Sequence, residues 1–215
     1  MKKNLQGLVP LLFSSTFVAL ILVAGYFQLR DWSQPAFVVG TTAVAIYLLW
    51  LVLESRVAAG ETQRERTKSD IGTCEAYALG RALTTLLALA MPRICSGYYH
   101  FMLAGLILFV CGITFRLVAI RTLGRFYSHR VRIAGDHQVV DTGPYRFLRH
   151  PAYTGMLVAH LGFVLIFMNL WAAIAWLVLL ITIIIRIRVE EKALFELPGY
   201  PEFAAKRCRL LPGLW

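Results

Sequence analysis

Long apolar segments, separated by short polar stretches, dominate the chain. The clearest are residues 8–27, 35–53 and 101–120, each about as long as a helix that crosses about 30 Å of hydrocarbon. Residues 151–185 carry no formal charge at all, and as one helix they would measure about 50 Å, more than a single span needs. We therefore predict two helices there, joined by a tight turn near Asn169.

A weaker apolar segment lies between Arg81 and Arg93. It is too short to cross the membrane unless one of these arginines extends its side chain to the interface. With this segment the pattern predicts six transmembrane helices, and without it five, so we expect an all-α, polytopic membrane protein. Residues 1–120 then form an N-terminal group of helices. Residues 121–215 form a C-terminal core with a turn, a helical hairpin and a cytoplasmic tail.

Three polar features lie in or beside the apolar segments. Arg116 is about one turn from the end of its segment, and we expect it to reach the interface. His160 is an intramembrane histidine and so a candidate for function, but an interhelical hydrogen bond explains it at least as well, and we leave it outside the predicted site. Residues 54–75 have mixed charge, which is typical of a solvated loop with some helical character, and we assign them no chemistry.

Composition and charge agree with a membrane protein. Hydrophobic residues make up 58% of the chain, and mean hydropathy is +0.64. The net charge of +10 does not require a nucleic-acid partner, because Lys and Arg lie almost entirely between the apolar segments. With both termini cytoplasmic, eighteen of the 22 basic residues lie inside and only Arg30 and Arg93 outside. This asymmetry predicts that residues 143–155 and the tail after residue 185 share the cytoplasmic face.

Cysteine usage gives no sign of a metal or of cross-links. The four cysteines, at positions 74, 95, 111 and 208, are scattered, with no Cys-x-x-Cys pair and no histidine at ligand spacing. We therefore predict neither a metal site nor a disulfide framework.

The polar turn at residues 143–155, GPYRFLRHPAYTG, runs straight into the longest apolar segment. Pro144 and Pro151 push the residue before each of them out of the helical conformation, and Pro151 suits the first position of a helix. That helix would present backbone N–H groups and the positive end of its dipole beside Arg149 and His150, which favours an anionic ligand. Basic residues that extend to lipid headgroups are the alternative explanation.

Two further residues of this turn suit a ligand. Tyr153 offers a phenol close to the start of the helix. Gly155 has no side chain, so a flat ligand can approach the backbone there. Neither residue is diagnostic by itself.

The second informative stretch is the tail, where Glu190 and Glu191 follow the last apolar segment. Adjacent residues of a helix point about 100° apart, so one glutamate can face an interior ligand while the other faces solvent or an arginine. The alternative is a plain helix-surface pair of Arg186 with Glu190, worth a few tenths of a kcal/mol.

Together these motifs resemble the isoprenylcysteine carboxyl methyltransferase family and the related phospholipid methyltransferases. The resemblance spans roughly residues 123–212. It rests on an RHPxYxG step, the GPY before it, the paired glutamates, and a Tyr-x-x-aromatic step ahead of a basic residue and proline. Phe203 is a departure, because the family more usually has tyrosine at that position, and it puts any hydroxyl role there in doubt.

The resemblance implies a helical membrane enzyme that binds S-adenosylmethionine without a Rossmann sheet, and the chain shows no GxGxxG after a strand pattern. The implied cofactor-binding residues are Gly143, Pro144, Tyr145, His150, Pro151, Tyr153, Gly155 and Glu190. The predicted catalytic residues are Arg149, Glu191 and Arg209. The tail contributes the last of these from a set of three basic residues, Lys206, Arg207 and Arg209.

The methyl acceptor is left open between two chemistries. A carboxylate of the isoprenylcysteine type needs no general base, only alignment in a water-poor site and an arginine to orient it. A phospholipid amine needs a proton acceptor, for which a glutamate of the pair is suited.

A sterol-reductase-like NADPH enzyme and a non-catalytic membrane protein are further alternatives to a methyltransferase. We predict the carboxylate, with lipids as the other partners and no nucleic acid. The N-terminal Met-Lys-Lys and short loops favour a prokaryotic plasma membrane.

Overall fold

Helices make up almost all of the regular structure in the computed structural model, which describes residues 2–59, 72–94, 97–127, 139–211 and 215. The α-helices are α1 (Lys2–Leu29), α2 (Ala36–Ala59), α3 (Thr73–Ala90), α4 (Tyr99–Leu123), α5 (Pro151–Phe167), α6 (Leu170–Leu194) and α7 (Tyr200–Ala205). Two 3-10 helices follow α4 and precede α5, namely η2 (Gly124–Phe126) and η3 (Gly143–Arg146). Extended pairing within these ranges is limited to an isolated parallel bridge between Leu148 and Cys208. The all-α prediction is confirmed.

Several helices have the length and composition to cross a membrane. Three stand out by both criteria, Ala36–Ser55, Tyr99–Phe126 and Leu170–Leu194, and Ser14–Leu29 and Pro151–Phe167 are shorter apolar helices. The prediction of a multi-pass membrane protein is supported by this set. The count of six spans stays a prediction, and α3, which contains Arg81, is again the least apolar of the six long helices.

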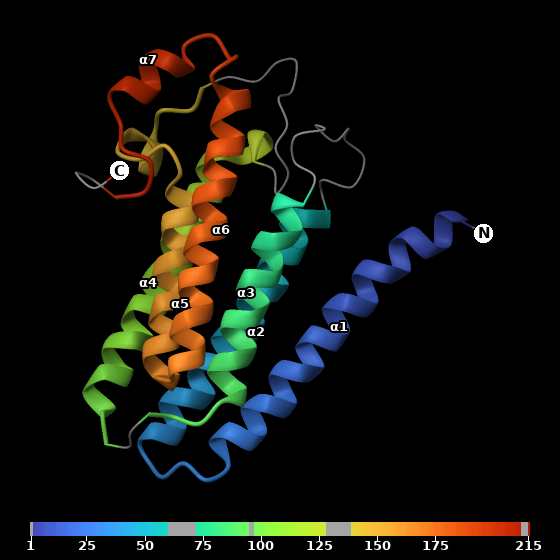
Figure 1. Cartoon of the computed structure of the whole chain (residues 1–215), viewed down its shortest axis with the longest axis vertical. Coiled ribbons are helices and arrows are strands. Elements are labelled where there is room, and N and C mark those ends of the chain that lie inside the picture. The colour runs from blue at the N-terminus through green and yellow to red at the C-terminus, as the bar shows by residue number, and fades with distance from the viewer. Residues whose placement is uncertain (1, 60–71, 95–96, 128–138, 212–214) are drawn as a thin grey trace.

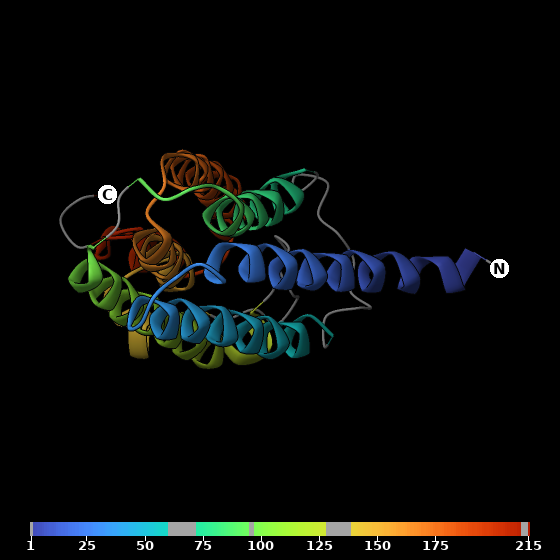
Figure 2. The ribbon, with the colours of Figure 1, turned by 90° about the horizontal axis from the view of Figure 1, so that it is seen from below.

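Figure 1 shows α2 to α6 as an elongated bundle, with α7 and the tail covering one end. At its C-terminal end α1 contacts the bundle, where the Gln28 side chain donates to the Met91 carbonyl at 3.3 Å. From there α1 leans away toward the N-terminus (Figures 1 and 2). A large apolar core runs along the bundle, and a smaller one lies under the tail, built from Ala119, Ile120, Tyr145, Ala152, Leu197, Tyr200, Phe203 and Ala204.

Glycines let α4 and α5 approach each other at backbone distance. A Cβ added at Gly112 would lie 2.3 Å from the amide nitrogen of Ala159, and one at Gly162 would lie 2.4 Å from that of Phe109. Side chains cannot occupy such positions, so glycine is required at both. Lipid gives apolar helices no hydrophobic reason to associate, and close packing of this kind supplies dispersion contacts instead. The bundle thereby holds α5, and with it the polar turn, against α4.

The predicted turn near Asn169 is confirmed as the connection between α5 and α6. Met168 adopts a φ of 30°, and the Asn169 side-chain oxygen caps α6 by accepting from the Ala172 amide at 2.8 Å. The Asn169 amide group donates to the carbonyls of Leu87 and Ala88 at the end of α3, each at 3.2 Å. This buried side chain therefore joins three helix ends. The connection between α5 and α6 lies at the end of the bundle opposite the tail (Figure 1).

Two arginines lie deeper than the sequence suggests. Arg81 sits in the middle of α3 and Arg116 is 1% exposed within α4, and both pair with Glu54 of α2 instead of extending to the interface. The interpretation of residues 54–75 as solvated is therefore wrong at Glu54, which is 6% exposed. Residues 60–71 of that stretch lie outside the described part. A membrane interior tolerates these charges because they pair with one another.

His160 is buried, and its Nδ1 lies 3.0 Å from the Met156 carbonyl of the same helix. This hydrogen bond is intrahelical and not interhelical. The imidazole also packs against the ring of Trp50, with 5.5 Å between the ring centres.

Candidate functional site

The turn before α5 and the C-terminal tail lie side by side. The Arg149 amide donates to the Cys208 carbonyl at 2.9 Å, and the His150 amide donates to the Arg209 carbonyl at 3.0 Å. The Thr154 hydroxyl adds a bond to the Leu210 carbonyl at 2.7 Å. The turn and the tail, which are almost 60 residues apart in sequence, therefore meet as the sequence predicts.

Arg207 strengthens this junction from the tail side. Its guanidinium donates to the carbonyls of Arg146 and Phe203, at 3.2 and 3.1 Å, and stacks 4.3 Å from the centre of the Phe203 ring. Its own carbonyl accepts from Arg149 Nε at 2.7 Å. The departure at Phe203 is thus accommodated by ring packing, which needs no hydroxyl. Of the three basic tail residues, Arg207 holds the fold, and Lys206 is exposed.

The backbone at the start of α5 has the conformation that Pro151 is expected to impose. Pro151 is the first helical residue, and His150 before it has φ −125° and ψ 56°, outside the helical region. The amides of Tyr153 and Thr154 both donate to the His150 carbonyl, at 3.1 and 3.2 Å. Because these donors are occupied, an anion at this helix start would depend on the basic side chains nearby more than on the backbone.

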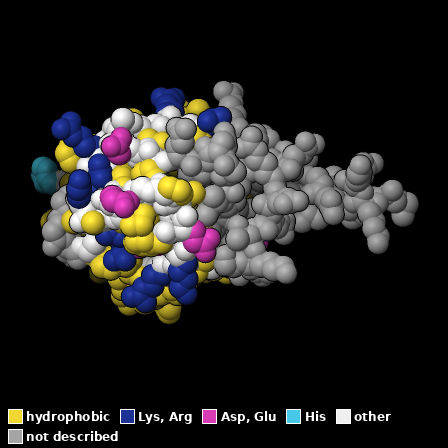
Figure 3. Space-filling model, turned by 90° about the horizontal axis from the view of Figure 1, so that it is seen from above, with side chains coloured by type: hydrophobic (Ala, Val, Ile, Leu, Met, Phe, Trp, Pro, Cys, Tyr) yellow, Lys and Arg dark blue, Asp and Glu magenta, His cyan; other side chains and the backbone are white. Residues whose placement is uncertain are grey.

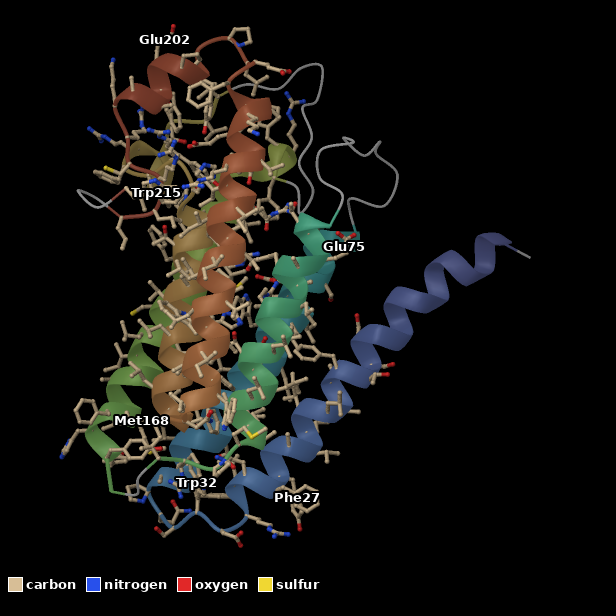
Figure 4. All side chains as sticks on the ribbon, in the orientation of Figure 1. Phe27, Trp32, Glu75, Met168, Glu202 and Trp215 are labelled. Carbon is tan, nitrogen blue, oxygen red and sulfur yellow. The ribbon has the colours of Figure 1, made fainter. Side chains whose placement is uncertain are left out.

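Glu191 is the centre of the charged cluster, with its side chain 5% exposed. One carboxylate oxygen, Oε1, accepts from Arg149 at 2.9 Å and lies 3.3 Å from His150 Nε2. The other, Oε2, accepts from Arg209 Nε at 2.7 Å. The structure thereby brings together Arg149, His150 and Glu191 with Arg209, which were predicted from two separate stretches of sequence, the turn and the tail. Figure 4 shows the nitrogen- and oxygen-bearing side chains gathered at this end, between the labelled Glu202 and Trp215.

Glu190 belongs to a second, adjoining chain of hydrogen bonds. The Tyr153 hydroxyl donates to Glu190 at 3.0 Å and itself accepts from Arg186 Nε at 2.7 Å. Arg186 is 1% exposed and also donates to Thr73 of α3 at 3.2 Å. A surface pair of Arg186 with Glu190 does not describe this arrangement, because the arginine is directed into the bundle. Both glutamates of the pair point inward, one to each chain of polar contacts.

The GPY step lies in η3, at the beginning of the turn. Gly143 has a φ of 55°, a conformation that favours glycine, and Pro144 follows at the start of the 3-10 helix. The Tyr145 side chain is buried in the smaller core, and burial raises the pKa of its phenol above the ordinary range. Tyr145 therefore stays neutral and packs under the tail. Whether it also contacts a cofactor stays a prediction.

Gly155 needs a correction. A Cβ there would lie 2.6 Å from the amide nitrogen of Arg116 and 2.7 Å from the carbonyl oxygen of Gly112, both on α4. The space in front of Gly155 is filled by α4, so the expectation that a flat ligand approaches this backbone is wrong. Helix packing explains the glycine, and we remove it from the candidate cofactor-binding residues.

Two residues that the sequence left out belong to the site. Arg186 holds the Tyr153 hydroxyl, as described above. Tyr200 of α7 is 5% exposed, and its hydroxyl has no hydrogen-bond partner among the described residues. Burial, and then the nearby charge of Glu191, raise the pKa of this phenol, which therefore stays a neutral donor. The Tyr-x-x-aromatic step was the signal for Tyr200, whereas no sequence motif pointed to Arg186.

Comparisons with known proteins agree with the geometry. The model of the "Isoprenylcysteine carboxyl methyltransferase (ICMT) family" matches residues 105–196. A rice relative, the "Probable protein-S-isoprenylcysteine O-methyltransferase" of Oryza sativa subsp. indica, is 30% identical over 164 residues, and the match covers 72% of this chain and 85% of the relative. The "Protein-S-isoprenylcysteine O-methyltransferase" of Saccharomyces cerevisiae is 36% identical over 95 residues, covering 43% and 40% of the two chains.

A solved structure shares the fold. It is described as the eukaryotic intramembrane Ras methyltransferase ICMT, and it superposes with a TM-score of 0.60 at 20% identity, over 92% of this chain and 74% of that one. The similarity to the rice relative extends beyond the C-terminal half to which the sequence motifs are confined. These matches support a methyltransferase over a sterol-reductase-like enzyme or a non-catalytic membrane protein. The chain belongs to the isoprenylcysteine carboxyl methyltransferase family of membrane enzymes.

Proposed function

We propose that this protein transfers a methyl group from S-adenosylmethionine to the carboxylate of an isoprenylated cysteine. The observation that supports this best is the meeting of the turn and the tail around Glu191, through Arg149, His150 and Arg209. Its relatives in rice and yeast carry the name protein-S-isoprenylcysteine O-methyltransferase. We transfer that substrate class to this chain as part of the proposal.

The described residues fit the polar groups of the cofactor. Glu190 accepts one bond, from Tyr153, and keeps acceptor capacity for an ammonium group. Arg149 and Arg209 each have N–H groups beyond those that bind Glu191 and the tail, and these suit a carboxylate. The unpartnered Tyr200 hydroxyl offers one more buried donor. When bound, S-adenosylmethionine supplies a methyl carbon activated by a positively charged sulfur.

The protein residues then have to align the acceptor and exclude water. A carboxylate is already nucleophilic, so no residue has to remove a proton from it. Arg149 and Arg209 can orient it through charge-assisted hydrogen bonds, and both are fixed by Glu191. Holding the reacting groups at near-attack distance can lower a barrier by up to about 7–11 kcal/mol. Catalysis in this proposal therefore rests on positioning.

Glu191 is poorly suited to accept the proton that methylation of a phospholipid amine would release. Three basic groups surround its carboxylate, and they stabilise the charged form, which makes it a poor acceptor for a proton. N-methylation of a phospholipid would then depend on Glu190 alone. We therefore assign Glu191 the role of holding the two arginines and keep the carboxylate as the proposed acceptor.

Two measurements test the proposed reaction. Purified protein in detergent should bind S-adenosylmethionine or its demethylated product in calorimetry. It should also transfer labelled methyl groups to a farnesylated cysteine, in a product that mild alkali releases as methanol. Label that resists alkali and travels with phosphatidylethanolamine derivatives would overturn the carboxylate. Failure to bind S-adenosylmethionine would overturn the methyltransferase itself.

Arg149→Lys provides the matched substitution. An ammonium keeps the charge but loses the planar, two-point grip on a carboxylate, so we expect transfer to fall about tenfold to a hundredfold. Arg146→Lys is the control, because Arg146 lies in the same turn with an exposed side chain. Equal losses in the two variants would contradict a direct role for Arg149.

We also propose that the site faces the cytoplasm. Figure 3 shows Lys and Arg distributed over the described part of the end that carries the tail, with fewer Asp and Glu. The exposed basic residues at this end include Arg121, Arg125, Arg146, Arg188, Lys192 and Lys206. This is the charge bias of a cytoplasmic face. The relatives named above are eukaryotic and do not support the prediction of a prokaryotic plasma membrane.

A further inference from the structure

Three helices of the N-terminal half and centre of the chain meet at Glu54. Its carboxylate pairs with Arg81 of α3 at 2.9 Å and with Arg116 of α4, and its side chain is 7% exposed. Arg116 is 1% exposed, so these charges are enclosed by the bundle. Residues 54 and 81 lie outside the segment that matches the family model, which begins at residue 105.

Arg116 carries this contact into the candidate site. Besides binding Glu54 through Nε, it donates from NH1 to the carbonyl of Ala152 at 3.0 Å and from NH2 to the Tyr127 hydroxyl at 3.1 Å. Ala152 lies between Pro151 and Tyr153 in the first turn of α5. Gly155 brings α5 against the backbone of the same arginine. The position of this turn therefore depends on where the Arg116 guanidinium is held.

Arg81 is connected differently. Its guanidinium lies over the rings of Trp50 and Tyr77, 5.3 and 5.6 Å from their centres, and forms an ion pair with Glu54. Removing Arg81 leaves the carboxylate of Glu54 paired with the Arg116 guanidinium. Removing the charge of Glu54 leaves two enclosed guanidiniums without their common partner, and like charges in a low-dielectric site repel strongly. This repulsion would displace the Arg116 guanidinium and, with it, Ala152, whose carbonyl it binds.

From these contacts we propose that Glu54 is a positioning residue, which acts through Arg116 to fix the first turn of α5 and so the cofactor-binding side chains on it. This inference rests on the proposed methyltransferase function and adds to it a role for α2. The N-terminal helices thereby take part in shaping the site as well as in anchoring the chain.

The test compares three variants of the full-length protein in detergent. Glu54→Gln should weaken binding of S-adenosylmethionine about tenfold to a hundredfold in calorimetry, at a temperature where circular dichroism shows the helices intact. Arg81→Gln should change the Kd less than threefold. Asn169→Ala destabilises the opposite end of the bundle, and it should lower the unfolding temperature without moving the Kd. Glu54→Asp, which keeps the charge, should recover part of the affinity, and it replaces Glu54→Gln if that variant fails to fold.

A distance measurement separates this inference from the proposed function. Nitroxide labels at Phe147→Cys and Glu202→Cys, both exposed positions, report the turn against α7 by pulsed electron resonance in a cysteine-free background. The distance distribution should broaden with Glu54→Gln and stay narrow with Asn169→Ala, whether or not a cofactor binds. An unchanged distribution and an unchanged Kd in Glu54→Gln, or equal effects of Asn169→Ala, would overturn the inference. If the wild-type protein binds no S-adenosylmethionine but the distribution still broadens in Glu54→Gln, the proposed function alone is overturned.

Discussion

Arg209 and Glu191 form a 2.7 Å ion pair that closes the last part of the chain into a loop over the start of α5. They are eighteen positions apart in the sequence, and α7 lies between them. Because Glu191 also holds Arg149, the pair links α6, the tail and the turn through one carboxylate. The tail is therefore part of the candidate site, together with α6 and the turn before α5.

Glu191→Gln tests this link. The amide keeps the shape but loses the charge, and it leaves Arg149 and Arg209 without their shared anion. Removing one partner of a buried pair typically costs about 3–5 kcal/mol, and we expect the lower part of that range because Arg209 is 30% exposed. Thermal unfolding in detergent measures the effect, with the exposed Glu202→Gln as control. Equal unfolding temperatures for the two variants would contradict a central role for Glu191.

Local sequence signals predicted the features that depend on neighbouring residues. Pro151 sets the start of α5 through its own backbone geometry, and Asn169 marks the break in an apolar stretch too long for one helix. The meeting of turn and tail followed from charge, because basic residues on one side of a membrane place the connecting segments together. These rules need no knowledge of which helices touch.

Such rules could not predict contacts between helices that are far apart in the sequence. Glu54 and Arg116 are 62 residues apart, and neither position shows in the sequence that its charge points inward. Gly155 was misread for the same reason, because a glycine in a helix fits a ligand and a neighbouring helix equally well until the packing is known. A buried ion pair and a close helix contact both depend on the surfaces of two helices. The sequence of one apolar segment describes only its own surface and not which helix packs against it.

Gly155→Ala is expected to be costly. The added methyl group would overlap the backbone of α4, which cannot move as a flexible side chain can. Overpacking of this kind typically costs about 1–3 kcal/mol. Gly25→Ala is a matched control, because a Cβ there meets Val44 at an ordinary 3.7 Å. Unfolding temperatures should fall clearly for the first variant and little for the second, and the reverse order would contradict the packing of α4 on α5.

Asn169→Asp separates the two roles of that side chain. Aspartate still caps α6, but it cannot donate to the carbonyls of Leu87 and Ala88, and it places a charge beside them. We therefore expect Asn169→Asp to be at least as destabilising as Asn169→Ala, by about 1–3 kcal/mol for the unpaired buried groups. Denaturation curves of the two variants check this. An aspartate variant as stable as wild type would show that the cap alone matters.

Single cysteines test the orientation of the bundle in the membrane. Ile94, 66% exposed in the connection between α3 and α4, lies near the turn of Asn169, since its amide donates to the Met168 carbonyl at 3.0 Å. Cys208 belongs to the tail at the other end. In a cysteine-free background, an impermeant maleimide applied to intact cells should label Ile94→Cys, whereas a restored Cys208 should react only after permeabilisation. Eighteen basic residues against two make the opposite orientation strongly unfavourable. Labelling of Cys208 in intact cells would place the site outside the cytoplasm, and labelling of both from one side would contradict the six-span topology.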